Sequence, residues 1–312
     1  MSPVFRLNLM LTAAMNVAVL IAAPLLGFAF PQASDLVPVA VWTGLFLAIA
    51  LIYTFIRFDA DISRSMYNIA LCAFFMSTGI MMSYLMTSAN RPLVDADLAA
   101  IDAALGFDWP KLVAFVADHP WIGRVSGVLY NVSLPLFLFI LLFLGFKKRN
   151  DRIEEFVLLL ILTGIVSNAV AALLPAEGTY LFHKPSQALI SSLTPTVDPA
   201  YMSDFHGLRD GTIRQLAIAG AKGLVTFPSY HTIFSLLMVY ALRGMGPVFY
   251  AALAINLGII ASTPLDGAHY LTDVIGGVAI FALLAVFASR LQRYLTARFE
   301  PTVWRPVVKE PG

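Results

Sequence analysis

The sequence predicts an all-α protein, a polytopic membrane bundle with about eight spans. Of its 312 residues, 59% are apolar and only 12% are charged, and the mean hydropathy is +0.80. A soluble domain has charge on about a quarter of its residues and could not keep so much apolar surface out of water. Apolar stretches close to the length of a membrane-spanning helix recur along the chain. They lie at about 8–30, 37–56, 67–88, 125–146, 156–174, 224–242, 248–263 and 269–289.

Composition also excludes several other classes of protein. The net charge of +1 argues against a broad nucleic-acid-binding surface, and the low charged fraction argues against disorder. Cys72 is the only cysteine, so a disulfide scaffold is excluded, and heptad repeats that would indicate a coiled coil are absent. We therefore expect an integral membrane protein that does not bind nucleic acid.

The orientation follows from the positions of Lys and Arg. These residues concentrate at alternate ends of the apolar stretches, most clearly at 147–152 and 290–309. Because cytoplasmic loops carry the excess of Lys and Arg, we expect both chain ends in the cytoplasm and an even number of spans. The stretch at 224–242 is one of the two shortest candidates, and if it is re-entrant this parity fails.

Two long loops then lie on the outer side. The loop at 89–124 contains two short amphipathic helices, which we expect on the membrane interface with Trp109 and Trp121 as anchors. The loop at 175–223 is rich in Pro, Ser, Thr, Gly and charge, and no soluble domain can be separated from the chain.

The sequence Pro-Ser-Tyr-His at 228–231 is the first candidate site. Pro fits the first turn of a helix and Ser caps it, so a helix is predicted to start here. A helix start offers unpaired amide N–H groups to phosphate, and His231 would sit one turn inside. The alternative is an ordinary helix start, with His231 reaching the membrane interface.

The second candidate is the pair His269 and Asp273. Residues four apart share one helix face, and Asp273 lies within an apolar helix, where an unpaired carboxylate is costly. A hydrogen bond to Asp273 would fix the imidazole tautomer and leave the other ring nitrogen basic. The alternative is a structural pair that closes the helix start. Together with His231 on the same side, the pair predicts phosphoryl-transfer chemistry without a metal.

At these residues the sequence resembles the type-2 phosphatidic acid phosphatase superfamily of membrane enzymes. That family has a Pro-Ser-Gly-His block, here 228–231, and a Ser-Arg-x5-His-x3-Asp block, here 262–273. Tyr230 replaces the glycine, Thr263 replaces the phosphate-binding arginine, and the family's first block is absent in its usual form. The pattern His-Tyr-x-x-Asp followed by small residues resembles the branch of the inositol phosphorylceramide synthases.

The resemblance implies a role for each matching residue. His269 would attack phosphorus and form a phosphohistidine, Asp273 would orient it, and His231 would act as general acid and base. Ser229, with nearby amides, would hold the phosphate. Tyr230, which departs from the family's pattern, is a further candidate for binding the substrate.

Three basic residues of the second outer loop, Arg209, Arg214 and Lys222, are candidates for the missing arginine. Arg209 is favoured over the other two because a planar guanidinium suits phosphate oxygens, and the alternative is a solvated loop charge. No residues have metal-ligand spacing, so we expect no metal and no other cofactor.

The predicted function is therefore lipid phosphotransfer. The expected reaction moves a phospho-alcohol head group between lipids, with substrates such as phosphatidylinositol and ceramide, and hydrolysis of phosphatidate or polyprenyl phosphates is the enzymatic alternative. A transporter with a proton relay and a scaffold with a decayed site are the non-enzymatic alternatives. A bacterial inner membrane with a periplasmic site is favoured, and an organelle membrane with a lumenal site fits as well.

The predicted organisation has three parts. Residues 1–120 form N-terminal spans and the amphipathic loop, 121–295 form a catalytic membrane core of six helices, and 296–312 form a cytoplasmic tail.

Overall fold

The computed structural model describes residues 1–299 except 187–188, 191–192, 194–199 and 219–223. In this part of the chain, seven helices are long and apolar enough to cross a membrane, which confirms the predicted helical membrane fold. These helices are α1 (Pro3–Leu25), α2 (Ala33–Phe55), α3 (Ala60–Thr87), α6 (Pro120–Phe146), α7 (Asn150–Leu173), α12 (Pro247–Asp266) and α13 (Leu271–Phe299).

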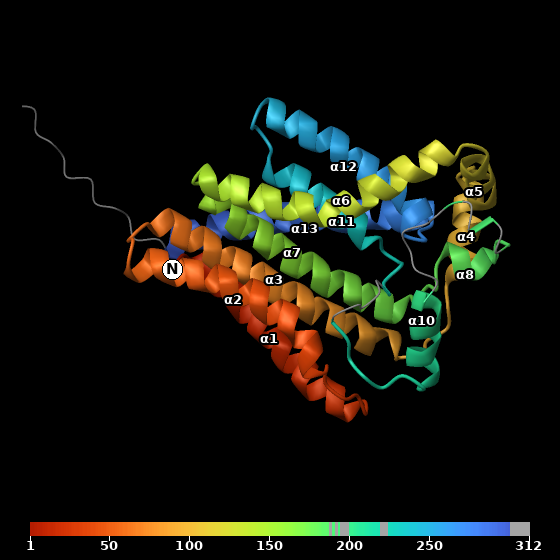
Figure 1. The fold of residues 1–312 in the computed structure, drawn as a ribbon, viewed down its shortest axis with the longest axis horizontal. Helices are drawn as coiled ribbons and strands as arrows, with labels where there is room; N and C mark the ends of the chain where they lie inside the picture. The colour runs from red at the N-terminus through yellow and green to blue at the C-terminus, as the bar shows by residue number, and fades with distance from the viewer. Residues whose placement is uncertain (187–188, 191–192, 194–199, 219–223, 300–312) are drawn as a thin grey trace, which may run out of the picture.

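Helix α11 (Tyr230–Ala241) is shorter than the span predicted at 224–242. Its 12 residues extend about 18 Å at a rise of 1.5 Å per residue. Residues 224–229 are not helical, because a residue before proline is disfavoured in the helical region and Ser229 caps the helix that follows. The N-terminus and the end of α13 lie at the same end of the bundle (Figure 1), which fits α11 as an eighth crossing.

Helix α7 lies at the centre of the bundle. It packs against α1, α3, α11 and α13, and its residues 156–161 are almost completely buried. A helix that is apolar on every side is stable only where other helices surround it. Helix α11 packs against α7, α12 and α13, so most of its residues are buried, while Tyr230 and His231 in its first turn are partly buried.

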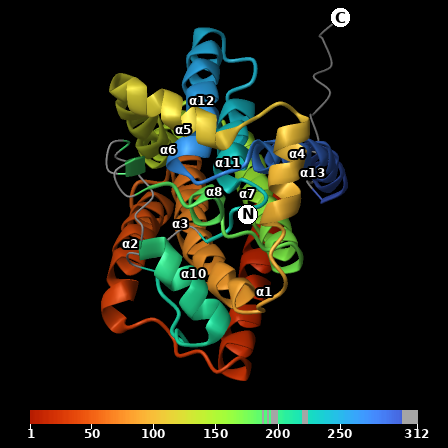
Figure 2. The same cartoon turned by 90° about the vertical axis from the view of Figure 1, so that its right-hand side faces the viewer.

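The outer-loop helices gather at the end of the bundle opposite the N-terminus (Figures 1 and 2). They are α4 (Asp95–Ala104), α5 (Trp109–Asp118), α8 (Thr179–His183) and α10 (Ala200–Asp210). The prediction of two short helices in the first outer loop agrees with α4 and α5.

The expectation that Trp109 anchors the protein in lipid is wrong. Trp109 is buried, its indole N–H donates to the carbonyl of Pro264 at 2.8 Å, and its ring stacks on His183. A buried indole N–H needs a partner, and the end of α12 supplies it. Trp121 is exposed and remains consistent with an interfacial position.

Candidate active site

The start of α11 is fixed against the start of α13. The Ser229 hydroxyl accepts from the amide of Thr232, and the amide of Ser229 donates to the carbonyl of Asp273 at 3.0 Å. Gly277 permits this approach, because a Cβ there would lie 2.7 Å from the Ser229 carbonyl oxygen. The two predicted motifs, whose histidines are 38 residues apart in the sequence, are therefore adjacent in the structure.

His269 and Asp273 form the predicted pair in a buried position. Nδ1 of His269 lies 3.1 Å from Oδ2 of Asp273, and the same oxygen accepts from the amide of Tyr270 at 2.9 Å. The imidazole also faces the backbone carbonyl of Thr226. Burial lowers the pKa of His269 to about 4, so the ring is neutral at physiological pH.

His231 is positioned by a residue that the sequence analysis missed. Tyr130, on α6, stacks on the His231 ring with the centroids 4.2 Å apart, and its hydroxyl lies 3.2 Å from Nδ1. The two histidines are close enough to interact electrostatically, since Ser229, two residues before His231, bonds the backbone of Asp273. An imidazole with an oriented partner and another imidazole with a carboxylate therefore occupy one site.

Helix α4 supports this site through two aspartates. Oδ1 of Asp102 accepts from the amide of Thr272 at 2.8 Å and from its hydroxyl at 2.6 Å, and Oδ2 accepts from the amide of Leu271 at 2.8 Å. Asp95 accepts from the Tyr270 hydroxyl at 3.0 Å and from two amides at 177–178. The signal in the sequence was the spacing of seven, which puts both carboxylates on one helix face.

The residues predicted to bind substrate are distributed differently. Ser229 lies at the site, but its hydroxyl and amide are engaged in the contacts described above. The hydroxyl of Tyr230 donates to the carbonyl of Leu160 at 3.2 Å, and its ring lines a cavity. Lys222 lies outside the described residues.

Arg209 belongs to a neighbouring cluster. Its guanidinium donates to the Arg91 carbonyl, lies over the Phe205 ring, and interacts electrostatically with Glu177 and Asp95. Asp95 in turn bonds Tyr270, the residue after His269, so this cluster borders the site. At the position of the family's arginine, Thr263 is buried and its hydroxyl donates to the carbonyl of Ile260.

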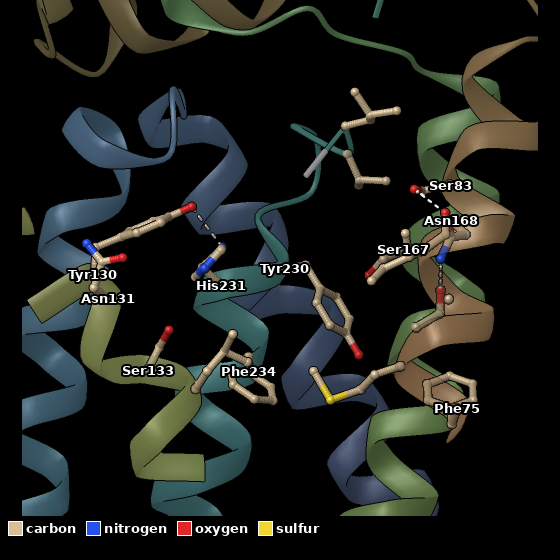
Figure 3. Close-up of a pocket in the computed structure, with 17 residues that line it drawn as sticks. Phe75, Ser83, Tyr130, Asn131, Ser133, Ser167, Asn168, Tyr230, His231 and Phe234 are labelled. Atoms are coloured by element: carbon tan, nitrogen blue, oxygen red, sulfur yellow. Dashed lines mark hydrogen bonds between the residues drawn. The ribbon is translucent and has the colours of Figure 1, made fainter. Parts of the chain in front are cut away.

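A cavity of about 410 Å³ adjoins His231 (Figure 3). It lies between α3, α6, α7 and α11, and apolar side chains such as Phe75, Leu134 and Phe234 form much of its lining. Among the described residues that line it, none is Asp, Glu, Lys or Arg. The cavity therefore suits an uncharged, mainly apolar group.

Fold and site together define a helical membrane protein with a buried histidine, His269, and a partly buried one, His231, which lines a mainly apolar cavity. Comparison with protein families matches residues 96–287 to the PAP2 superfamily. The chain belongs to this superfamily, and membership indicates lipid phosphatase or phosphotransferase chemistry in the membrane. Neither the curated proteins nor the solved structures provide a match.

Proposed function

We propose that this protein transfers a phospho-alcohol head group between membrane lipids through a phosphohistidine on His269. The observation that carries the proposal is the proximity of His231 to the His269–Asp273 pair. A nucleophile with an orienting carboxyl group and a separate acid–base group are the parts that metal-independent phosphoryl transfer requires.

The first step transfers the head group to the protein. His269, with Nδ1 held by Asp273, uses the lone pair of Nε2 to form a bond to phosphorus. The bond between phosphorus and the oxygen of the donor lipid alcohol breaks, and this oxygen takes a proton from His231. The products are a neutral lipid alcohol and a phosphorylated His269.

The second step returns the proton. The hydroxyl of the acceptor lipid loses its proton to His231 and attacks phosphorus, and the N–P bond to His269 breaks. His231 is protonated again and His269 is free. With water as the acceptor the same steps describe hydrolysis, which is the alternative reaction.

The lining of the cavity beside His231 supports a lipid acceptor. Its apolar side chains and the lack of ionised side chains among its described lining residues favour an uncharged lipid alcohol. We propose that the phosphate lies outside this cavity, at the helix starts, with Arg209 or Lys222 as the cation that replaces the missing arginine. The catalytic unit then includes α4 in addition to 121–295, because Asp95 and Asp102 contact the 270–272 segment.

The proposed location is the outer side of a bacterial inner membrane. The N-terminus, the junction of α6 and α7 with its basic residues at 147–152, and the end of α13 lie at one end of the bundle, while α11 and α13 both start toward the opposite end (Figure 1). The donor and acceptor lipids would then come from the periplasmic leaflet. We propose phosphatidylinositol and ceramide as the first substrates to test, because the sequence resembles the inositol phosphorylceramide synthase-like branch.

The test is a search for phosphohistidine. Purified protein in vesicles is exposed to phosphatidylinositol labelled in the phosphate, and acid-labile label on the protein is measured with and without ceramide. We expect label on the wild-type protein, loss of label in His269→Ala, and transfer to ceramide when it is added. Full activity in His269→Ala would overturn the mechanism, and release of labelled inositol phosphate to water with no transfer to ceramide would replace the transferase by a hydrolase.

A further inference from the structure

The wall of the cavity opposite His231 carries two polar side chains that each have an oxygen without a hydrogen-bond partner among the described residues. Ser167 and Asn168 lie next to each other on α7, and Figure 3 shows them across the cavity from His231 and Tyr130. Ser167 is 1% exposed and Asn168 is 9% exposed. The hydroxyl oxygen of Ser167 and Oδ1 of Asn168 have no hydrogen-bond partner among the described residues.

The hydrogen-bonding character of Asn168 is fixed by its surroundings. Its Nδ2 donates to the carbonyl of Gly164 at 2.9 Å, and this bond sets the orientation of the side-chain amide. The remaining oxygen, Oδ1, can only accept a hydrogen bond. The Ser167 hydroxyl can donate or accept. The described residues include other buried polar atoms without partners, such as Oδ1 of Asn68 and Asn256. Among them, those of Ser167 and Asn168 belong to residues that line this cavity, where a ligand can supply the missing bonds.

An unpaired acceptor needs a donor on the ligand. A diacylglycerol has one hydroxyl, which is the reacting group, and its ester oxygens only accept. A lipid alcohol that also has an amide N–H or a second hydroxyl keeps a donor free when its first hydroxyl is beside His231. The unpaired oxygens of Ser167 and Asn168 therefore favour a lipid alcohol with a second hydrogen-bond donor over a diacylglycerol.

We propose that Ser167 and Asn168 are specificity-determining residues that bind the second hydrogen-bond donor of the lipid alcohol. The proposal rests on the proposed function, since His231 must face the reacting hydroxyl. The cavity then selects amide-bearing lipid alcohols over diacylglycerols. A site built around a hydrogen bond rejects an analogue that lacks the donor, because its own polar atoms stay unpaired.

A binding experiment tests this without requiring catalysis. The full chain is placed in lipid nanodiscs of one composition, and its affinities for ceramide and for diacylglycerol with matched acyl chains are measured. We expect wild-type protein to bind ceramide at least about tenfold more tightly. In the double variant Ser167→Ala with Asn168→Leu, the two affinities should differ by less than about twofold.

Two controls keep the result interpretable. Ser133→Ala removes a hydroxyl from another wall of the same cavity and should retain the preference for ceramide. A ceramide analogue with a methylated amide and a keto group in place of the second hydroxyl should lose the preference on unmodified protein. This arm does not depend on the folding of a variant.

The outcomes separate the two proposals. Equal binding of ceramide and diacylglycerol by wild-type protein, or a preference that persists in the double variant, would overturn this inference. Loss of the preference for ceramide in Ser133→Ala would also overturn it, because the preference would then not depend on Ser167 and Asn168 in particular. Absence of phosphohistidine would overturn the proposed function, while a preference that depends on Ser167 and Asn168 would still establish the lipid subsite.

Discussion

The Asp102 carboxylate accepts hydrogen bonds from both the amide and the hydroxyl of Thr272, although the two residues are 170 positions apart. Asp102 therefore serves as the cap of α13 from a helix in the first outer loop. The two amides that Asp102 binds, those of Leu271 and Thr272, lie between His269 and Asp273, so α4 helps to determine where the site's carboxyl group and imidazole lie. This gives the outer loop a part in catalysis that hydropathy alone did not indicate.

Replacement of Asp102 by Ala should weaken the site without removing a reacting group. Loss of the cap frees the amides of Leu271 and Thr272 and should lower the free energy of unfolding by about 1–2 kcal/mol. The rate of phosphohistidine formation should fall while donor-lipid binding changes little. Thermal unfolding and single-turnover labelling measure the two effects.

Asp97 provides the matched control for this change. It lies on the same helix but is exposed, so Asp97→Ala should leave both the unfolding temperature and the labelling rate close to those of the wild type. Equal losses in the two variants would contradict a positioning role for Asp102.

Tyr130→Phe should separate stacking on His231 from the hydrogen bond. Phenylalanine retains the ring contact but loses the hydroxyl 3.2 Å from Nδ1, so the imidazole is held less firmly. We expect the turnover rate to fall by about tenfold with little change in stability. Steady-state kinetics and thermal unfolding measure this, with Tyr250→Phe, at an exposed tyrosine on α12, as the control. Unchanged turnover would show that His231 needs no support from Tyr130.

Much of the fold was predictable because its signals are local. Long apolar stretches specify membrane helices regardless of their neighbours, and seven of the eight predicted ranges coincide with long helices whose ends differ from the prediction by at most ten residues. The His269–Asp273 contact was likewise predictable, since residues four apart on a helix face each other. Span 224–242 was overextended because hydropathy does not register the effect of Pro228.

The supporting residues were not predictable for the opposite reason. Tyr130 contacts His231 across 101 positions, and Asp95 contacts Tyr270 across 175. Nothing in one sequence states which helix end meets which, so a tyrosine in a span and an acidic residue in an outer loop look ordinary. Trp109 was misplaced in the same way, because its partner at Pro264 lies 155 positions further along the chain.

The pH dependence of labelling should reflect the burial of His269. Burial lowers the pKa of this imidazole from 6.5 to about 4, so the neutral nucleophile persists as the pH falls through 6. In rapid-quench labelling of the free enzyme, the acid limb should therefore appear only below about pH 5. An acid limb centred at the ordinary histidine pKa would contradict the buried, neutral state of His269.

The same pKa shift predicts how stability depends on pH. Between pH 4 and 6.5 the unfolded chain binds a proton at position 269 that the folded chain does not, so the free energy of unfolding rises with pH across this window. Stability should decline as the pH falls from 6.5 to 4. Thermal unfolding of His269→Gln should show a smaller decline in stability over this pH range than the wild type does. An identical decline in the variant would assign the pH dependence to other groups.

Gly277→Ala should separate the starts of α11 and α13. The added Cβ would lie 2.7 Å from the Ser229 carbonyl and 3.2 Å from Cβ of Thr232, both of which are held by buried contacts. Relief of this clash requires a helix shift, which should cost about 1–3 kcal/mol and move His231 away from His269. Phosphohistidine labelling by the donor lipid should fall by more than the loss of folded protein accounts for.

Gly44→Ala on α2 is the control, because nothing lies within 4 Å of its added Cβ, and its labelling should stay at the wild-type level. Normal labelling in Gly277→Ala would mean that the close approach of the two helices is not needed to align the histidines.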